Sequence, residues 1–336
     1  MHPALSRLNS TPASAATDSA VAPALATLHP LEDLAVVQAE GAEAVTFLQG
    51  QLTNDIAGAG PDQARLAGYC TAQGRLLATL VAWHGVPGID GTPLVHALVR
   101  QDILAPLLKR LGMFVMRAKV RLSAAPLQVV GVMTDPTCLE TFCKTIGHAL
   151  PTTPWQALQT ETGTWIAAPC TGTLRWWWIA GQEHVTSCAD LLAQMSVSSP
   201  QAWHVQDILA GLPWIEAATQ DLFIPQTLNL DLIQGVSFTK GCYPGQEIVA
   251  RSHYRGTVKR RMALGSTTAA VLPRAGTDLY DGTAPAQPCG RLINAAGAYV
   301  LFEAPFDAVE HAALHLGSAD GPTVTPQPLP YSTRPA

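Results

Sequence analysis

The chain has 336 residues, of which 48% are hydrophobic and 13% are charged, and its formal net charge is −5. This composition provides apolar material for about two domains, and the negative charge excludes a general electrostatic attraction to nucleic acid, although not one local basic patch. The sequence has no uninterrupted apolar run of about 18 residues, so no membrane span is predicted.

The N-terminal composition and the cysteine pattern bear on the compartment. Residues 1–30 are rich in Ala, Ser, Thr and Pro and lack the features of a secretory signal, so we expect a disordered tail and a cytoplasmic protein, with an organellar address as the lesser alternative. The seven cysteines include no CxxC, which favours free thiols in a reducing compartment. The ten histidines form no HExxH motif, and we expect no permanently bound metal.

Short apolar runs separated by turn residues predict the first unit of the fold. The expected strands cover 34–39, 69–71, 75–83 and 94–99. The expected helices open at Gly41 and at Ile103, and Gly112 is placed as the stop of the second. Gln73-Gly74 predicts a hairpin turn between the second and third strands.

A second unit is predicted from residue 127. Its expected elements are a strand at 127–133, a helix from about 137 to 146 that Gly147 closes, and a strand at 174–179. The last strand contains three adjacent tryptophans. Because side chains alternate along a strand, Trp176 and Trp178 should lie on one side and Trp177 on the other, all of them in packing roles.

The best-marked helix begins after Ser199, a good N-cap, with Pro200 at its first position and Gly211 just past its end. Its apolar stripe consists of Val205, Ile208, Leu209 and Leu212. At about 100° per residue, Trp203 falls nearly opposite this stripe. A tryptophan off the buried stripe must cover another surface, so we expect it to contact a neighbouring domain or a ligand.

From Arg261 onward the pattern changes. Short apolar runs now alternate with turns rich in proline and glycine. This pattern predicts a small separate β-domain, most simply a barrel.

The segment Lys240-Gly241-Cys242-Tyr243-Pro244-Gly245-Gln246-Glu247 carries the strongest chemical signal. Two glycines and a proline in six residues predict a tight loop, and a helix is expected from Gln246 onward. Cys242 therefore precedes a helix N-terminus and lies two residues from Lys240, and both features favour the thiolate if the thiol is accessible. The alternative is that Cys242 is a small buried hydrophobe, as free cysteines usually are.

Five basic residues follow within eleven positions, with no acid among them. They are Arg251, Arg255, Lys259, Arg260 and Arg261. Two interpretations stay open for this basic run. It forms a solvated face or a set of salt bridges at a domain junction, or it binds an anionic tail, phosphate or RNA.

The loop resembles the signature of the YgfZ family. The matching residues are Lys240, Gly241, Cys242, Tyr243, Gly245, Gln246 and Glu247. Further stretches are similar to the family at Leu48 to Asp55, Gly211-Leu212-Pro213, Phe223 to Gln226, Ala250-Arg251, Arg255-Gly256, Lys259-Arg260 and Leu329-Pro330-Tyr331. The resemblance spans residues 31–332 approximately.

This resemblance implies an α+β, aminomethyltransferase-like folate-binding fold with a C-terminal β-barrel. Residues 31–255 would form two intertwined α+β subdomains, the second at about 120–200, and residues 256–336 the barrel. The resemblance also implies a monomer that binds tetrahydrofolate or a one-carbon derivative. Its role would be the maturation or repair of iron–sulfur client proteins, among them enzymes that thiolate tRNA, without classical turnover.

The family's functional residues carry over unevenly. Trp203 falls where the family has a folate-contacting tryptophan, and Leu34 where close relatives have a second one. Leu209 falls where the wider fold carries an acid that grips the folate ring. We therefore expect weak folate binding, of about micromolar affinity or poorer. Cys242 and Lys240 match the motif as the functional thiol and its charge partner.

Three other functions remain open. A tetrahydrofolate-dependent aminomethyltransferase or demethylase would carry an aspartate pair after the hairpin glycine, where this chain has Ala78 and Thr79, and neither can serve as a carboxylate. A binding module for tRNA or a protein partner would use the basic run near Arg255. A cysteine hydrolase would need a histidine beside Cys242, and only His253 is near it in sequence.

Overall fold

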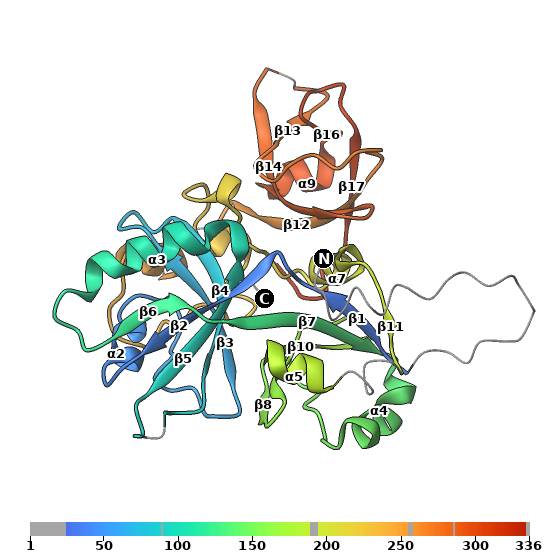
Figure 1. Ribbon diagram of the computed structural model, residues 1–336. Helices are drawn as coiled ribbons and strands as arrows, with labels where there is room; N and C mark the ends of the chain where they lie inside the picture. Colours follow the sequence, from blue (N-terminus) through green and yellow to red (C-terminus); the bar gives the residue numbers. More distant parts are fainter. Residues whose placement is uncertain (1–24, 89, 189–193, 255–257, 285, 334–336) are drawn as a thin grey trace, which may run out of the picture.

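Two antiparallel-rich sheets and a closed barrel make up the fold (Figure 1). A computed structural model describes residues 25–333, apart from 89, 189–193, 255–257 and 285. The barrel stands at one end of the molecule, and the two sheets lie side by side below it in this view. The α+β class and the C-terminal barrel expected from the sequence are both confirmed.

The first sheet has five strands in the order β3-β4-β5-β2-β6, and every neighbouring pair is antiparallel. Its strands are β2 (Leu34–Glu40), β3 (Ala64–Cys70), β4 (Leu76–His84), β5 (Leu94–Arg100) and β6 (Arg121–Ala124). Helices α2 (Ala44–Gln49) and α3 (Gln101–Val115) bury their apolar sides against one face of it. The predicted stop at Gly112 is wrong, because α3 continues to Val115. Glycine inside a helix costs only about 1 kcal/mol, which the packed first turns of α3 outweigh.

The second sheet has six strands in the order β11-β1-β7-β10-β9-β8. They are β1 (Thr27–Pro30), β7 (Leu127–Thr134), β8 (Ala157–Thr160), β9 (Gly163–Ala167), β10 (Leu174–Gly181) and β11 (Ser196–Val197). The 3₁₀ turn η2 (Pro136–Cys138) and helices α4 (Leu139–Ile146) and α5 (Gln182–Ser187) flank this sheet. Gly147 closes α4 in the left-handed conformation, as predicted.

Strand β1 corrects the expected length of the N-terminal tail. Residues 27–30 pair with β7 on one side, and Thr27 and Leu28 also pair with β11 on the other. The Leu28 side chain is buried in the apolar cluster on the outer face of the sheet, so this short segment belongs to the core. Residues 1–24 of the predicted tail lie outside the described residues. The described part of the chain thus contributes β1 to the second sheet, then forms the first sheet, and then returns to the second.

The three adjacent tryptophans alternate as predicted. Trp176 and Trp178 lie in the outer cluster of the second sheet, where Phe142 of α4 packs against Trp176 at a ring-centroid distance of 5.9 Å. Trp177 faces the opposite way, into the large core that the two sheets share with the rest of the molecule. The fold places all three in packing roles.

Helix α7 (Pro200–Leu209) lies between the second sheet and the barrel (Figure 1). The Ser199 side chain accepts a hydrogen bond from the Gln201 amide, and Gly211 takes a φ of +64°, so both predicted helix boundaries are confirmed. The Tyr331 hydroxyl donates to the Gly211 carbonyl oxygen at 2.9 Å, which fastens the C-terminal segment to the end of α7.

The barrel closes in the order β12-β15-β14-β13-β16-β17. Its strands are β12 (Arg260–Thr267), β13 (Asp278–Asp281), β14 (Pro288–Ala296), β15 (Tyr299–Pro305), β16 (Leu314–Leu316) and β17 (Thr323–Gln327), with α9 (Phe306–His311) after β15. Between α7 and the barrel run η3 (Ala217–Thr219), η4 (Pro225–Leu228) and α8 (Gln246–Tyr254). Among the described residues, the helices are all too short or too polar to cross a bilayer.

Candidate functional site

The motif loop, residues 240–245, packs against the hairpin turn between β3 and β4. Gly245 has a φ of +80°, and a Cβ atom there would lie 2.6 Å from the Cα atom of Gly74 and closer still to the Thr71 carbonyl oxygen. Gly74 also has a positive φ, of +74°. Gly241, by contrast, has no atom within 4 Å of a Cβ position. The loop therefore needs glycine at 245 to contact the hairpin, and has no such need at 241.

Lys240 anchors this loop to the first sheet's helix. Its ammonium donates hydrogen bonds to the carbonyl oxygens of Gln49 and of Leu52, the latter at 2.6 Å, at the C-terminal end of α2. Burial lowers the pKa of Lys240 to about 8, although the charges of Asp55 and Cys242 act in the opposite direction. The charge of Lys240 thus acts on Cys242, while its hydrogen bonds hold the motif loop against the end of α2.

Cys242 is the exposed thiol of the chain. The other six cysteines, all within the described residues, are buried or half-buried. Tyr243, the next residue, is buried, and its ring centre lies 5.0 Å from the Lys240 ammonium nitrogen. Helix α8 begins at Gln246. The loop therefore holds an aromatic anchor inward and the Cys242 side chain outward, and Cys242 is not a buried hydrophobe.

The basic run divides between the surface and a domain junction. Arg260 forms a two-pronged ion pair with Glu303, at 2.6 and 2.9 Å, and donates to the Cys289 carbonyl oxygen at 2.8 Å. Arg261 forms a second such pair with Asp231, both contacts at 2.9 Å. Both arginines thus form salt bridges. That of Arg261 joins the barrel to the segment before the motif loop, and that of Arg260 lies within the barrel. A role of Arg260 in anion or partner binding stays a prediction.

The rest of the run lies on and after α8. Arg251 is exposed and pairs with Glu247 one turn earlier, at 2.8 Å. Lys259 is exposed. Arg255 lies outside the described residues, and so does the side chain of His253. A partner role for Arg251 and Lys259 stays a prediction.

Trp203 and Leu34, the expected folate contacts, lie inside the core. Trp203 is 0% exposed, and Leu34 is 5% exposed. The indole of Trp203 fills the space above Gly131 in β7, where a Cβ atom would lie 2.7 Å from the Cδ2 atom of the ring and closer still to Cε3. The Arg175 guanidinium lies 4.7 Å from the ring centre. The off-stripe tryptophan thus covers the neighbouring sheet. In this conformation it presents no surface to a ligand, which corrects the expectation that it lines a pocket.

The positions of the missing aspartate pair are also buried. Ala78 and Thr79 are both 0% exposed in β4. The Thr79 hydroxyl accepts a hydrogen bond from the Ile215 amide at 2.9 Å, so it has a structural partner. Neither side chain offers the carboxylate that the aminomethyltransferase alternative requires.

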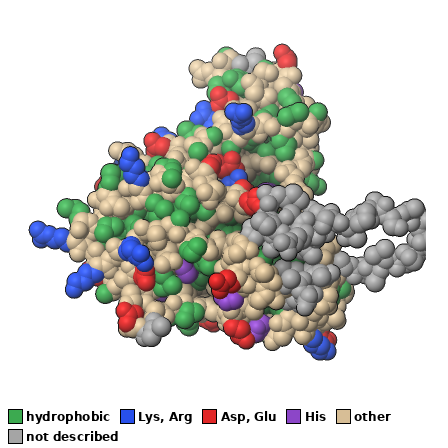
Figure 2. Space-filling model, in the orientation of Figure 1, with side chains coloured by type: hydrophobic (Ala, Val, Ile, Leu, Met, Phe, Trp, Pro, Cys, Tyr) green, Lys and Arg blue, Asp and Glu red, His purple; other side chains and the backbone are tan. Residues whose placement is uncertain are grey.

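A cavity of about 320 Å³ lies where the first sheet, α7 and the barrel meet. Besides Gln201 and Arg274, its polar lining comes from Arg100 at the end of β5, His204 and Asp207 on α7, Glu216 after α7, and Asn294 on β14. Figure 2 shows acidic and basic side chains gathered in the hollow between the barrel and the sheets. These five side chains come from segments far apart in sequence, so no local motif could have brought them together.

A charged network surrounds this cavity. The Asp33 carboxylate pairs with His204 at 2.9 Å and with Arg100, whose guanidinium also lies 3.5 Å from Glu216. The Asn294 amide donates to the Glu216 carboxylate at 3.0 Å. The buried Nε of Arg100 has no hydrogen-bond partner among the described residues. This N–H group is therefore an unsatisfied donor that protein atoms enclose beside the cavity.

Asp207 sits at the floor of the network. Its carboxylate lies 2.7 Å from the buried guanidinium of Arg175 and accepts a hydrogen bond from the Trp214 indole at 3.0 Å. Burial lowers the pKa of His204, but hydrogen bonds and charges from Asp207 and Asp33 outweigh it and raise the pKa to about 9. Burial raises the pKa of Glu216, and Arg100 opposes this. At neutral pH the cavity thus presents a charged imidazole on α7.

Comparison with known proteins gives a family and a fold. No family model matches the chain. The chain is 32% identical over 258 residues to the tRNA-modifying protein YgfZ of Yersinia pseudotuberculosis serotype IB (strain PB1/+), covering 75% of this chain and 74% of the relative. It is 31% identical over 260 residues to the protein of the same name from Escherichia coli O139:H28 (strain E24377A / ETEC), covering 75% and 76%.

A solved structure agrees at the level of the fold. The glycine cleavage system aminomethyltransferase T from Bartonella henselae superposes with a TM-score of 0.66 at 14% identity, over 89% of this chain and 84% of that protein. Such low identity supports the architecture alone. With the signature loop in place and the two relatives matched over three quarters of their length, the chain belongs to the YgfZ family and has the aminomethyltransferase fold.

Proposed function

We propose that this protein is a folate-binding accessory protein that supports the maturation or repair of iron–sulfur proteins and, through them, tRNA thiolation. The observation that carries the proposal is the signature loop, which presents Cys242 as the exposed thiol on a rigidly anchored backbone. A thiolate in this setting can attack a disulfide, accept a sulfur atom or ligate iron transiently.

The cavity between the three units fits a folate ring. Its volume of about 320 Å³ is within the range of roughly 300–1,000 Å³ usual for small-molecule sites. A pterin offers N–H groups on one edge and ring acceptors beside them. Glu216 and Arg100 both line the cavity, so the Glu216 carboxylate can accept from the first and the Arg100 guanidinium can donate to the second. Asp207 is already engaged by Arg175 and Trp214, so we assign the ligand contact to Glu216.

This assignment replaces two expected contacts. Leu209 offers no acid, and Trp203 offers no exposed surface. Glu216 lies on the segment after α7 and reaches the cavity from another side. Since Glu216 is the one carboxylate assigned to the ligand and it also accepts from Asn294, affinity in the micromolar range or poorer, about −8 kcal/mol or weaker, remains the expectation.

A separate tRNA-binding module is not proposed. Arg260 and Arg261 of the basic run form ion pairs within the molecule. Their guanidiniums are therefore not available as phosphate contacts in this conformation.

Titration with tetrahydrofolate tests the folate part of the proposal. Trp214 lines the cavity, so its fluorescence should change on binding. Glu216→Gln should weaken binding about tenfold, the effect of losing about 1.4 kcal/mol of charged hydrogen bonding. Glu183→Gln, on an exposed position of α5, is the matched control and should bind like the wild type. Equal affinity of the Glu216 variant and the wild type would remove this cavity as the folate site.

A further inference from the structure

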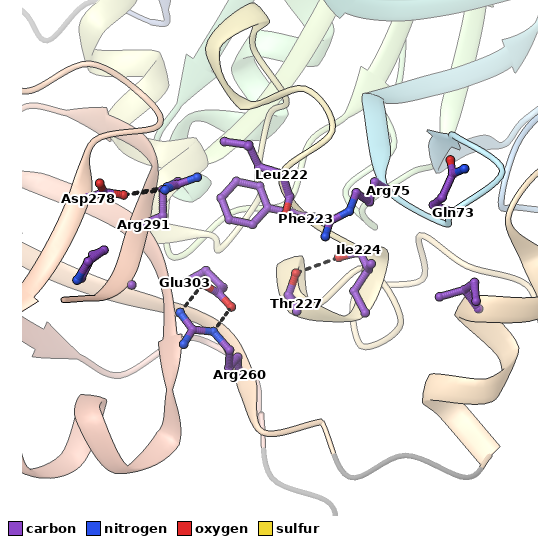
Figure 3. Close-up of a pocket in the computed structure, with 13 residues that line it drawn as sticks. Gln73, Arg75, Leu222, Phe223, Ile224, Thr227, Arg260, Asp278, Arg291 and Glu303 are labelled. Atoms are coloured by element: carbon purple, nitrogen blue, oxygen red, sulfur yellow. Dashed lines mark hydrogen bonds and ion pairs between the residues drawn. The ribbon is translucent and has the colours of Figure 1, made fainter.

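A second cavity, of about 540 Å³, lies on the side of the molecule where the β3–β4 hairpin, α8 and the barrel converge (Figure 3). The segment Leu222–Thr227 forms its middle wall, and Ile248 of α8 contributes another side. None of its lining residues belongs to the folate cavity, and the proposed function makes no use of it.

Three guanidiniums and two carboxylates face this cavity. Arg75 comes from the hairpin, and Arg260 and Arg291 come from barrel strands β12 and β14. Figure 3 shows Arg75 and Arg291 on opposite sides of the Leu222–Phe223 segment. The carboxylates, on Asp278 and Glu303, pair with Arg291 and Arg260. The lining therefore has one positive charge in excess, and it belongs to Arg75.

Arg75 is oriented without being neutralised. Its Nη1 donates to the Leu222 carbonyl oxygen at 2.9 Å and lies 3.4 Å from that of Asp221. These carbonyl groups fix the plane of the guanidinium, but they are neutral and do not compensate its positive charge. The hydrogen bonds within the described part of the chain leave Nε and Nη2 of Arg75 unused. These two N–H groups lie on one edge of the fork, the edge that binds a carboxylate or phosphate in bidentate fashion.

Arg291 is held in a similar way from the other side. Its Nε and Nη2 both donate to one carboxylate oxygen of Asp278, at 2.9 and 2.7 Å. No described hydrogen bond uses its Nη1. Because its direction is already fixed, less side-chain entropy is lost when a ligand accepts from it, which favours binding.

Apolar side chains complete the lining. Leu222, Phe223, Ile224 and Ile248 face the cavity beside the arginines. A free inorganic anion would leave these groups in contact with water, whereas an organic body would cover them. The cavity thus combines one anion-binding edge with a hydrophobic wall.

We propose that this cavity binds a small organic anion, whose single carboxylate or phosphate group is held by Arg75, with Arg291 facing the same space and the organic body against the apolar wall. The carboxylate could come from an amino-acid or glutamyl compound and the phosphate from a nucleotide. Both offer a pair of oxygens that can accept hydrogen bonds from the free edge of Arg75.

Calorimetric titration of the full chain in low-salt, phosphate-free buffer distinguishes these sources. The probes are inorganic phosphate, adenosine 5′-monophosphate and γ-glutamylglutamate. We expect one of the two organic anions to bind at least tenfold more tightly than inorganic phosphate. If neither binds better than inorganic phosphate, the proposal is wrong.

Two variants locate the binding. Arg75→Gln should weaken the preferred probe at least tenfold, and Arg291→Gln should weaken it by a smaller factor, because the Arg291 guanidinium is already paired with Asp278. Arg121→Gln, an exposed arginine paired with Glu40 in the first sheet, is the control. If Arg75→Gln and Arg291→Gln both bind like the wild type, the site lies elsewhere. Glu216→Gln should leave this binding unchanged, so a failure of the folate proposal would not be mistaken for a failure here.

Discussion

Accessibility separates Cys242 from the other cysteine side chains. Iodoacetamide at neutral pH should label Cys242 first, because its thiol is exposed on the loop, whereas burial raises the pKa of Cys70 to about 12 and keeps it a neutral thiol. Mass spectrometry of peptides after brief labelling measures the order. Preferential labelling of any half-buried cysteine would show that exposure does not decide reactivity here.

The same residue is expected to be indispensable in the cell. Cys242→Ala should fold normally, since the side chain makes no buried contact, but should fail to restore iron–sulfur enzyme activity in a strain lacking the protein. Cys138→Ala, at a half-buried position, serves as the control and should restore activity. Full complementation by Cys242→Ala would make the thiol dispensable and leave function to the cavities.

His204 should give the stability of the protein a pH dependence. Its pKa is raised from 6.5 to about 9, so its charged pairing stabilises the fold fully below pH 6.5, and this contribution is lost as the pH rises towards 9. His204→Gln should remove that loss. Urea unfolding at pH 6, 7.5 and 9 gives the free energy of unfolding of both proteins, and the contribution of His204 is the difference between wild type and variant. Lys240 has the opposite effect, because its lowered pKa of about 8 makes stability rise with pH above that value. This effect is the same in both proteins, so it cancels in the difference. A constant difference across the window would contradict the assignment.

At the scale of the elements, two glycines of one loop should respond differently. Gly245→Ala should destabilise the protein by about 1–3 kcal/mol, because residue 245 has a positive φ and a Cβ atom would collide with the hairpin backbone. Gly241→Ala should change stability by less than about 0.5 kcal/mol, since nothing lies near its Cβ position. Thermal unfolding of the two variants side by side is the measurement. Similar losses in both would mean that the loop does not pack as observed.

The contact between α7 and the second sheet depends on one tryptophan. Trp203→Ala should cost about 3–5 kcal/mol of stability, because it leaves a cavity above Gly131 that the sheet cannot fill. It should also weaken folate binding several-fold, because α7 carries His204 and Asp207 and borders the proposed site. Denaturant unfolding and the folate titration test the two effects. Unchanged affinity in a destabilised variant would limit Trp203 to packing.

Patterns among neighbouring residues predicted the helices and strands better than they predicted which residues line the cavities. Ser199 and Gly211 mark the ends of α7 by capping chemistry that depends only on neighbouring residues, and Trp177 follows from strand alternation. Strand β1 was missed because four residues form a strand only when β7 is there to pair with them. The cavity at Glu216 was missed for the same reason. Its side chains are assembled by tertiary packing from segments that show no shared pattern.

At the scale of the whole molecule, one ion pair joins the barrel to the segment before the motif loop. Arg261→Met removes the partner of Asp231, whose side chain is 6% exposed, and leaves a carboxylate buried and unpaired. The expected cost is about 3–5 kcal/mol. Arg121→Gln breaks an exposed pair instead and should cost less than about 1 kcal/mol. Chemical unfolding of both variants gives the comparison. A small effect at Arg261 would show that this ion pair does not hold the barrel in place.

The pairing of β12 with β17 also sets an order for assembly during synthesis. Strands β2 to β6 are consecutive in the chain, so the first sheet can form while the rest is still being translated. The barrel cannot close before residue 327 has left the ribosome, because β12 needs β17 as one of its two neighbours. Until then β12 has an unpaired edge, which in a nascent chain can recruit strands from other molecules. A ribosome stalled between residues 305 and 323 would therefore carry a folded first sheet beside an open barrel, the form of this protein most in need of a chaperone.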